Sequence, residues 1–388
     1  MDDKQEMKRS LAIERFLAGE SPEVIWRTLR RSERWFFKWL ARYRTGEEHW
    51  YKEQSRRPHG FPARTIRKVE EAVEFVRGEL WEAGEFCGAQ VINWRLEELG
   101  VKPLPSTRTI GRILARHGLI CRRKGRYQPK GTPYPRLAAK RPNDVHQTDF
   151  VGPRHLRGGL RFYSLHSVDM VTGRCGVQPV VGGRSLVVGA LWAIWRRLGL
   201  PRYQQVDNES CFYGSQACPR GMGKLIRLCL MYAVEPVFIP LQEPWRNGVA
   251  EKFNCHWQQK FLGRVKLATQ EDLYRESLAF EGRHNRRWRY SKLKGKTPLE
   301  ALAAADVKLR FPPTSEPPAE PLPKPKRGRY HVVRLIRSDA VLNLFGERFA
   351  VPREAVYEYV LATVDVRRQR LLLYMGAELI DDRAYPTR

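Results

Sequence analysis

The segment 145–152, VHQTDFVG, places an acidic side chain in the middle of a stretch that otherwise reads as a β-strand. Asp149 is followed at once by Phe150 and Val151, so its carboxylate is not expected to be freely solvated. A buried carboxylate is costly unless it is paired or bound to a metal ion. The segment therefore predicts a strand that carries a functional acid.

The sequence on the C-terminal side of this strand, up to about residue 305, alternates short apolar runs with helical patterns. Three strands joined by short turns, followed by strands that alternate with helices, predict a mixed sheet with helices on both sides. The expected elements are a hairpin over 161–170 and 175–182, an apolar helix over 186–198, a strand over 203–208, a helix over 224–233, a buried strand over 234–240 and a helix over 247–261.

Two further acids occupy informative positions in this region. Asp207 lies where a predicted strand ends, in QVDNES, and Glu251 lies in the last helix, in NGVAEKFN. If these acids meet Asp149 at one edge of the sheet, the carboxylates repel each other and divalent cations relieve the repulsion. Oxygen ligands without Cys or His favour Mg²⁺ or Mn²⁺, and two such ions support in-line phosphoryl transfer.

Each of these two acids also has a purely structural interpretation. Asp207 followed by Asn208 is a common way to start an Asx-turn. Glu251 near a helix N-terminus is stabilised by the helix dipole even on a free surface. The three positions alone leave these alternatives open.

The N-terminal 54 residues predict three helices. The first covers 8–18, the second begins with Ser21 as N-cap and Pro22 in its first turn, and the third is basic and aromatic around Trp39. This order is typical of a helix-turn-helix unit, although an ordinary three-helix bundle has the same outline. A connector rich in Pro, Gly and Arg follows at 55–64.

A second helical module is predicted after the connector, with helices over 66–81, 88–99 and 106–117. Ser106 is the expected N-cap of the last helix, and serine, threonine and arginine at a helix start can meet phosphates and base edges. Residues 101–143 contain twelve Lys or Arg and no Asp or Glu. This run favours nucleic-acid contact over a merely solvated basic face.

Composition points to the same class of partner. The 388-residue chain has 70 Lys and Arg against 42 Asp and Glu, a net charge of +28, which selects polyanions. No apolar run is long enough to span a bilayer and the N-terminus lacks an apolar signal core. The seven cysteines form no CxxC pair and no Walker motif occurs, so zinc and nucleotide are not expected. We expect a reduced, cytoplasmic and nucleoid-associated protein without membrane contact.

The C-terminal part begins with seven prolines between 312 and 325, which predict a stiff extended linker. After it, residues 330–380 alternate apolar and polar side chains in short runs. These runs predict four or five strands of a small barrel.

Four sequence segments together resemble the motifs of retroviral-integrase-like DDE transposases, in particular those of bacterial insertion sequences. They are HQTDF, DNES, PWRNGVAEKFN and, at 288–302, WRYSKLKGKTPLEAL; in addition LFGERFAVPRE at 344–354 is similar to insertion-sequence transposases. The chain departs from the pattern in three ways. Tyr290 replaces the usual histidine of the closing signature, Asp207 and Glu251 are 44 positions apart, and no HHCC zinc module precedes the core.

The resemblance implies a multidomain protein with an RNase H-like α/β catalytic core. The expected domains are a helix-turn-helix domain at 1–54, a second helix-turn-helix or winged-helix-like domain at 62–128, the core at 140–305 and the β-barrel at 326–388. It implies a metal-binding catalytic triad of Asp149, Asp207 and Glu251 with two Mg²⁺ or Mn²⁺ ions. The implied activity is nicking at element ends and joining of the 3′-hydroxyl ends to target DNA.

Other residues are expected to contact DNA or to support the triad. Asn208 and Asn247 each lie within about one turn of a triad acid and are expected to shape loops. Lys252 faces either a phosphate or solvent, and the basic cluster around 283–296 is either a DNA track or a helix end that complements its own dipole. The predicted DNA contacts are Thr107, Arg108, Arg122, Arg123, Lys124, Arg126, Lys252, Arg283, Arg287 and Arg289.

The expected partners are double-stranded DNA, as element terminal inverted repeats and as target, and further copies of the chain. Joining two ends requires at least a dimer assembled on DNA, and a partner ATPase is a further possibility. Two alternatives remain at this stage: a catalytically inactive DNA-binding regulator or targeting protein that keeps the fold, and an RNase H-type nuclease.

Overall fold

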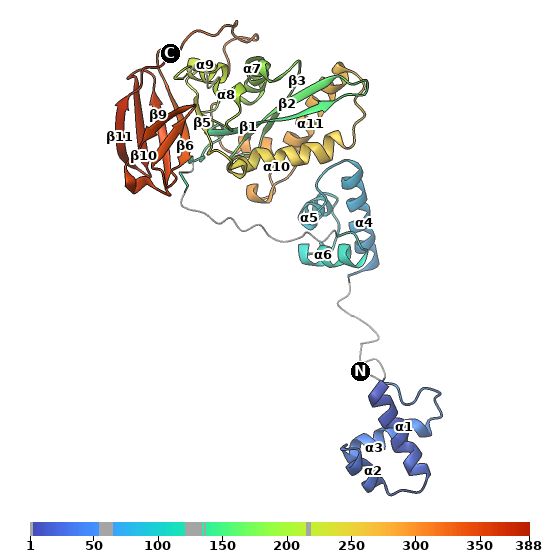
Figure 1. The fold of residues 1–388 in the computed structure, drawn as a ribbon. Helices are drawn as coiled ribbons and strands as arrows, with labels where there is room; N and C mark the ends of the chain where they lie inside the picture. Colours follow the sequence, from blue (N-terminus) through green and yellow to red (C-terminus); the bar gives the residue numbers. More distant parts are fainter. Residues whose placement is uncertain (1–2, 54–64, 121–133, 136, 215–218) are drawn as a thin grey trace. The chain divides into compact units, whose positions relative to one another are not determined.

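A computed structural model describes residues 3–53, 65–120, 134–135, 137–214 and 219–388 of the chain (Figure 1). It divides into two compact units, Met1–Arg64 and Thr65–Arg388, which are described separately. Within the described residues, no helix combines the length and the apolar character needed to cross a bilayer.

The first unit is a bundle of three helices around a small apolar core. Ser32 caps the third helix by accepting a hydrogen bond from the Trp35 amide, and Pro22 stands in the first turn of the second. Ile25 and Phe36 are fully buried between the helices. The three predicted helices are therefore confirmed. Their bounds are α1 (Asp3–Leu17), α2 (Pro22–Thr28) and α3 (Glu33–Arg44).

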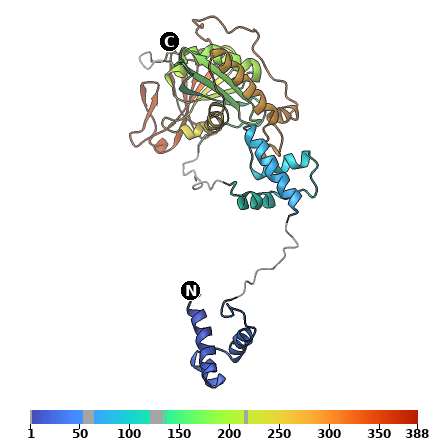
Figure 2. The same cartoon turned by 90° about the vertical axis from the view of Figure 1, so that its right-hand side faces the viewer.

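The second helical module forms a group of its own beside the core in both views (Figure 1, Figure 2). Its helices are α4 (Arg67–Glu82), α5 (Ala89–Glu98) and α6 (Thr107–Arg116). The Ser106 side chain accepts a hydrogen bond from the Thr109 amide at 3.2 Å, which confirms it as the N-cap of α6. Ile92 and Ile110 are fully buried among the three helices.

The central region contains the predicted mixed sheet. Its first three strands pair antiparallel, the fourth pairs parallel with the first, and the fifth pairs parallel with the fourth. The strands are β1 (Val145–His155), β2 (Arg161–Asp169), β3 (Cys175–Val181), β4 (Tyr203–Val206) and β5 (Glu235–Phe238).

Helices cover both faces of this sheet. Leu165 of β2 packs with Trp192 and other α7 side chains on one face, while Phe162 of the same strand packs with Trp257 on the other. This alternation along β2 confirms the predicted layering. The helices are α7 (Val187–Leu198), α8 (Ser210–Tyr213), α9 (Lys224–Met231), α10 (Gly248–Trp257), α11 (Gln270–Arg287) and α12 (Pro298–Ala303), with short 3₁₀ or π turns η1 (Arg184–Leu186), η2 (Pro244–Asn247), η3 (Gln258–Leu262), η4 (Ser291–Leu293) and η5 (Arg353–Ala355).

The C-terminal strands extend the central sheet. They are β6 (Arg329–Leu335), β9 (Tyr359–Asp365), β10 (Arg370–Met375) and β11 (Glu378–Ala384), and β7 (Val341–Leu344) with β8 (Glu347–Ala350) forms a separate hairpin. β6 pairs parallel with β5, so that the nine strands run β11-β10-β9-β6-β5-β4-β1-β2-β3 (Figure 1).

The small barrel expected at 326–388 is thus not confirmed, although its strands are present. Closure needs the first and last strands of the unit to pair, but β6 lies between β5 and β9, and β11 pairs only with β10 among the described strands. The edge of β6 that would close a barrel pairs with β5 of the core sheet instead, and β11 therefore stays at the open edge of the sheet.

The proline-rich segment 312–325 has no helix or strand, as predicted, yet part of it packs on the core. Leu322 is buried in the same apolar cluster as α9. Arg227 of α9 donates a hydrogen bond to the Leu322 carbonyl at 2.9 Å, and Lys224 forms an ion pair with Glu320. This segment therefore follows the surface of the core over its second half.

The shared sheet predicts that core and C-terminal strands unfold together. Phe238 of β5 is fully buried, with its ring centroid 5.1 Å from that of Phe345 in the β7–β8 hairpin. Phe238→Ala should lower the free energy of unfolding by about 3–5 kcal/mol. Hydrogen exchange read by mass spectrometry should show β4, β5, β6 and β9 losing protection in one transition. Leu379→Ala, at an exposed position of β11, is the control, and separate transitions for β5 and β9 would contradict the shared sheet.

Candidate active site

The register between β1 and β4 places two of the predicted acids side by side. The strands run parallel, with Gln147 opposite Gln205. Two residues further along the chain are Asp149, within β1, and Asp207, directly after β4. Because side chains alternate between faces with a period of two, both acids continue the face that their glutamines occupy. Both are half-buried.

The helix that carries Glu251 is attached to this same face. The Gln147 side-chain oxygen accepts hydrogen bonds from the amides of Val249 at 2.9 Å and Ala250 at 3.2 Å. These amides belong to the first turn of α10, where backbone donors have no partner within the helix. Glu251 stands in that turn and is half-buried. All three predicted triad acids therefore lie on one side of the sheet.

Their negative charges influence one another. Burial, followed by the charges of Asp207, Glu209 and Glu251, raises the pKa of Asp149 to about 7, against a backbone hydrogen bond that lowers it. Burial, followed by the charge of Glu209, raises the pKa of Asp207 to about 6. Shifts of this kind arise where carboxylates converge in a poorly solvated place.

A buried hydrogen-bond chain that sequence reasoning missed holds Asp149. Asn254 Nδ2 donates to Asp149 Oδ2 at 2.7 Å, and its Oδ1 lies 2.7 Å from His166 Nδ1. Because the amide oxygen accepts, His166 carries its proton on Nδ1, and its Nε2 accepts from the Ser164 hydroxyl at 2.8 Å. His166 is opposite Asp149 in the β1–β2 register, and burial lowers its pKa to about 4. The hydrogen-bond partners of Asp149 are therefore neutral groups, and they orient its carboxylate.

The only sequence signal for this chain was partial. Asn254 stands three positions after Glu251 in AEKFN, one helical turn away on the same face. Nothing local in 161–169 distinguishes His166 from any other strand residue. Its role depends on the pairing of β1 with β2, which the sequence does not display.

A fourth acid, Glu209, was also missed. It lies two residues after Asp207, and its charge raises the pKa of both Asp149 and Asp207. Arg184 holds it through an ion pair of 2.7 Å and also donates to the Gly152 carbonyl at 3.3 Å. Glu209 was visible in DNES, but only the fold shows that it faces the other acids.

Asn208 and Asn247 each donate a side-chain hydrogen bond to a backbone carbonyl elsewhere in the core. Asn208 Nδ2 donates to the Ile239 carbonyl at 2.6 Å, after the end of β5. Asn247 Nδ2 donates to the Thr148 carbonyl of β1 at 3.0 Å, just before α10. Each asparagine thus ties the segment beside a predicted triad acid to a neighbouring strand.

The acids do not form a preassembled metal cluster. In the part of the chain that the structure describes, no group of three or more His, Cys, Asp or Glu side chains is arranged to hold a metal ion. The donor set nevertheless suits a hard divalent cation, because it consists of carboxylates on one face whose mutual repulsion raises the pKa of Asp149. The residues present therefore fit Mg²⁺ or Mn²⁺ in chemistry, with side-chain rotation needed to bring their oxygens onto one ion.

The predicted DNA contacts are dispersed. Thr107 and Arg108 are exposed at the start of α6, Lys252 is exposed on α10, and Arg283 is half-buried on α11. The predicted contacts at Arg122, Arg123, Lys124 and Arg126 lie outside the described residues.

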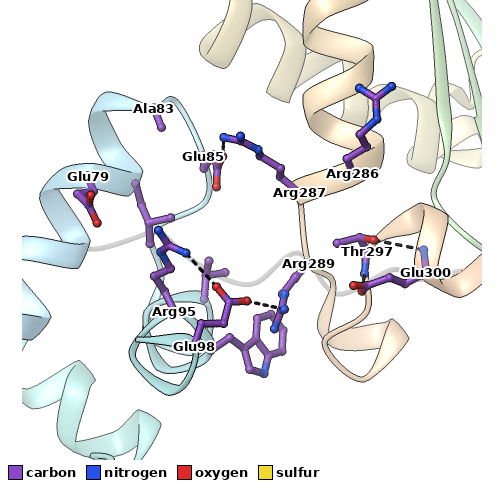
Figure 3. Close-up of a pocket in the computed structure, with 13 residues that line it drawn as sticks. Glu79, Ala83, Glu85, Arg95, Glu98, Arg286, Arg287, Arg289, Thr297 and Glu300 are labelled. Atoms are coloured by element: carbon purple, nitrogen blue, oxygen red, sulfur yellow. Dashed lines mark hydrogen bonds and ion pairs between the residues drawn. The ribbon is translucent and has the colours of Figure 1, made fainter. Parts of the chain in front are cut away.

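Arg287 and Arg289 face the second helical module across a pocket (Figure 3). Arg289 forms an ion pair with Glu98 at 2.5 Å, and Arg287 is 4.0 Å from Glu85. Beside them the Phe86 ring packs on Trp288, with centroids 4.6 Å apart. These two arginines thus contact protein, so their predicted role in a DNA track competes with a role in holding the module.

Comparison with known proteins gives one family match. Residues 3–51, which span α1–α3, match a family described as a homeodomain-like domain. This match agrees with the predicted helix-turn-helix unit at the N-terminus. A search of curated proteins found no match.

Among solved structures, retroviral integrases are similar to parts of the chain. The HTLV-2 integrase catalytic core domain in complex with magnesium is 18% identical, with 42% of this chain and 99% of that chain covered and a TM-score of 0.32. The simian T-cell lymphotropic virus intasome in complex with a PP2A B56 gamma subunit is 15% identical, with 82% and 100% covered and a TM-score of 0.36. The BIV integrase catalytic core domain is 15% identical, with 42% and 96% covered and a TM-score of 0.32. Because these TM-scores are all below 0.4, the description of the architecture depends on the strand pairing given above and not on these similarities.

The raised pKa of Asp149 predicts how pH affects stability in metal-free protein. A carboxyl whose pKa rises from 3.8 to about 7 on folding removes stability as pH increases through that window, because the folded state resists ionisation. Asp149→Asn should therefore melt at a higher temperature than wild type at pH 8 in EDTA, with the difference vanishing towards pH 4. Glu354→Gln, at an exposed acid, is the control. A difference independent of pH would refute the assigned cause.

A charge swap separates the two roles of Arg289. If the residue holds the second helical module, Arg289→Glu should lower stability by about 0.2–1 kcal/mol. The double variant with Glu98→Arg should be more stable than Glu98→Arg alone, which also loses the ion pair of Glu98 with Arg95 at 3.1 Å. DNA affinity should then be restored in parallel. If the double variant regains stability but still binds DNA as weakly as Arg289→Glu, the guanidinium contacts DNA instead.

Proposed function

We propose that this protein is a DDE transposase of the insertion-sequence type, with an RNase H-like core. It would bind the ends of its element, nick them and join the freed 3′-hydroxyls to target DNA. One observation supports the proposal: Asp149 and Asp207 follow paired glutamines of β1 and β4, α10 with Glu251 is bonded to the same face, and the charges of Asp207 and Glu251 raise the pKa of Asp149.

In this proposal Asp149, Asp207 and Glu251 hold two Mg²⁺ or Mn²⁺ ions. Bound divalent ions would supply Lewis-acid activation of the attacking oxygen and charge neutralisation at the leaving oxygen. The protein itself holds the Asp149 carboxylate in place through Asn254 and the start of α10 through Gln147. Lys252, exposed next to Glu251, is the proposed contact to a neighbouring phosphate.

The two helical modules are the proposed readers of the terminal inverted repeats. In the N-terminal unit, α3 exposes Arg34 and Arg44, and residues 3–51 match the homeodomain-like family. In the second module, Thr107 and Arg108 open α6 with their side chains exposed. The net charge of +28 supplies the attraction to element ends and target DNA alike.

Joining two ends in one event requires two active sites, so we propose that at least two copies assemble on DNA, with a separate ATPase as a further partner. The proposed setting is the nucleoid in the cytoplasm. A rival function is a DNA-binding regulator that no longer cuts. The observation in its favour is the lack of a preassembled metal cluster among the described residues.

Isosteric neutralisation of the acids tests the proposal. With a labelled duplex carrying the inverted repeats that flank the gene, Asp149→Asn, Asp207→Asn and Glu251→Gln should each reduce Mn²⁺-dependent nicking on the order of 10³-fold or more. End binding should stay within about twofold of wild type or tighten, because anionic repulsion is lost. Glu354→Gln is the matched control. Specific footprinting by a wild-type protein that never nicks would favour the regulator, and unchanged nicking in all three variants would reject the triad.

A further inference from the structure

The C-terminal strands approach the proposed active site through the pairing of β6 with β5. β6 pairs with β5 through Val237 opposite His331 and Phe238 opposite Val332. Arg334 follows two residues after Val332, beyond the carboxyl end of β5. That is the edge of the sheet at which Asp207 leaves β4, because Val206 is opposite Phe238 in the β4–β5 register.

Arg334 is a buried guanidinium, only 5% exposed, and neutral oxygens surround it. Its Nε donates to the Asn343 carbonyl at 3.0 Å and its Nη1 to the carbonyls of Ile239 at 3.1 Å and Val333 at 2.9 Å. Its Nη2 donates to Asn208 Oδ1 at 2.9 Å. No described acid forms an ion pair with it. A buried charge without a counter-ion is costly, so simple packing does not account for it.

The contact with Asn208 connects Arg334 to an acid-bearing segment. Asn208 directly follows Asp207, and its Nδ2 donates to the Ile239 carbonyl that also accepts from Arg334. The asparagine amide is therefore fixed at both ends, by β6 and by the residue after β5. This fixes the backbone from which the Asp207 side chain projects.

A second contact from the C-terminal sheet holds the start of the Glu251 helix. The Tyr359 hydroxyl of β9 donates to the Glu243 carboxylate at 2.7 Å, and Arg246 donates to Glu243 at 2.8 Å and to the Tyr359 oxygen at 2.9 Å. Tyr359 is 7% exposed and Glu243 8%. Arg246 lies in η2, which leads directly into α10.

The backbone of Arg246 closes the connection to both acid-bearing strands. Its carbonyl accepts hydrogen bonds from Gln205 Nε2 at 3.0 Å and from Gln147 Nε2 at 3.3 Å. These glutamines stand two residues before Asp207 and Asp149. The contact that begins at Tyr359 therefore ends at the base of the proposed site.

We propose that Arg334 and Tyr359 of the C-terminal sheet are positioning residues for the acids of the core. Arg334 orients the Asp207 segment through Asn208, and Tyr359 orients the start of α10, and with it Glu251, through Glu243 and Arg246. The inference rests on the proposed function for its catalytic consequence. Under this proposal Arg334 and Tyr359 contact neither DNA nor metal. The C-terminal sheet therefore affects cation binding and the rate of cutting, and it does not affect recognition of the element ends.

Two small substitutions test this, each with a neighbouring control. Tyr359→Phe removes one hydroxyl, and Tyr357→Phe makes the same change at a position that is 65% exposed. Arg334→Lys keeps the charge, but the three N–H groups of a single ammonium cannot replace the four hydrogen bonds that the guanidinium makes from three nitrogens. Arg337→Lys is its exposed control. The measurements are Mn²⁺ affinity of the DNA-free full chain by electron paramagnetic resonance, the single-turnover nicking rate at saturating duplex, the dissociation constant for the duplex, and the melting temperature in EDTA.

We expect Tyr359→Phe and Arg334→Lys to weaken Mn²⁺ binding and slow nicking about 10-fold each. Duplex affinity should stay within about twofold of wild type, and excess Mn²⁺ should restore part of the rate. The two controls should match wild type. A merely structural role would lower the melting temperature while leaving Mn²⁺ affinity and the rate per folded molecule unchanged, and that result would overturn the proposal.

A double-variant cycle tests the route through Asn208. If Arg334 acts through this residue, Asn208→Ala with Arg334→Lys should lose no more Mn²⁺ affinity than the larger single loss. Additive losses would overturn the route. If the wild-type chain itself does not nick, the proposed function fails, but the Mn²⁺ titrations still decide the positioning role: weakened binding in Tyr359→Phe and Arg334→Lys supports it, and unchanged binding rejects it.

Discussion

The parallel register between β1 and β4 is the constraint on which the proposed site depends. It places Gln147 opposite Gln205, and therefore brings Asp149 and Asp207 to equivalent positions two residues later. The same glutamine, Gln147, accepts the free amides at the start of α10. A slip of one residue in either strand would turn its acid to the opposite face, towards α7. A slip in β1 would also leave the first turn of α10 without its acceptor, Gln147. Strand pairing and helix docking thus act on one face together.

Within that frame, electrostatics and hydrogen bonding oppose each other. Burial and neighbouring charges raise the pKa of Asp149 and Asp207, so bringing the acids together weakens the metal-free fold. The neutral chain through Asn254 and His166 keeps the Asp149 carboxylate oriented despite this cost. Enzymes that transfer phosphoryl groups with metal ions depend on such oriented carboxylates. A cation that binds between the carboxylates offsets their mutual repulsion. The arrangement is therefore consistent with a site that is completed by its cations.

The larger unit is more integrated than a series of independent domains. β6 continues the core sheet, so the C-terminal strands share its hydrogen bonds and apolar core. On another side, Phe86 packs on Trp288 and Arg289 pairs with Glu98, which joins the second helical module to the end of α11 (Figure 3). A displacement of the C-terminal strands or of the second helical module can therefore be transmitted to the proposed site through these contacts. Arg287 and Arg289 illustrate the consequence, since side chains that look like a DNA track in the sequence contact protein in the fold.

Local signals in the sequence determined the elements and the candidate acids. Ser106 predicted the start of its helix, the order of strands and helices after Asp149 predicted a mixed sheet covered on both sides, and an acid before Phe150 indicated a strand that does more than pack. These features depend on neighbours a few residues away in the chain, so the local sequence is enough to predict them. Tertiary structure alone decided that β6 joins β5 instead of closing a barrel, that His166 reaches Asp149 through Asn254, and that Arg334 lies behind Asp207. Each of these depends on which strand edges meet, and an open edge can pair with any other strand until the whole fold limits the choice.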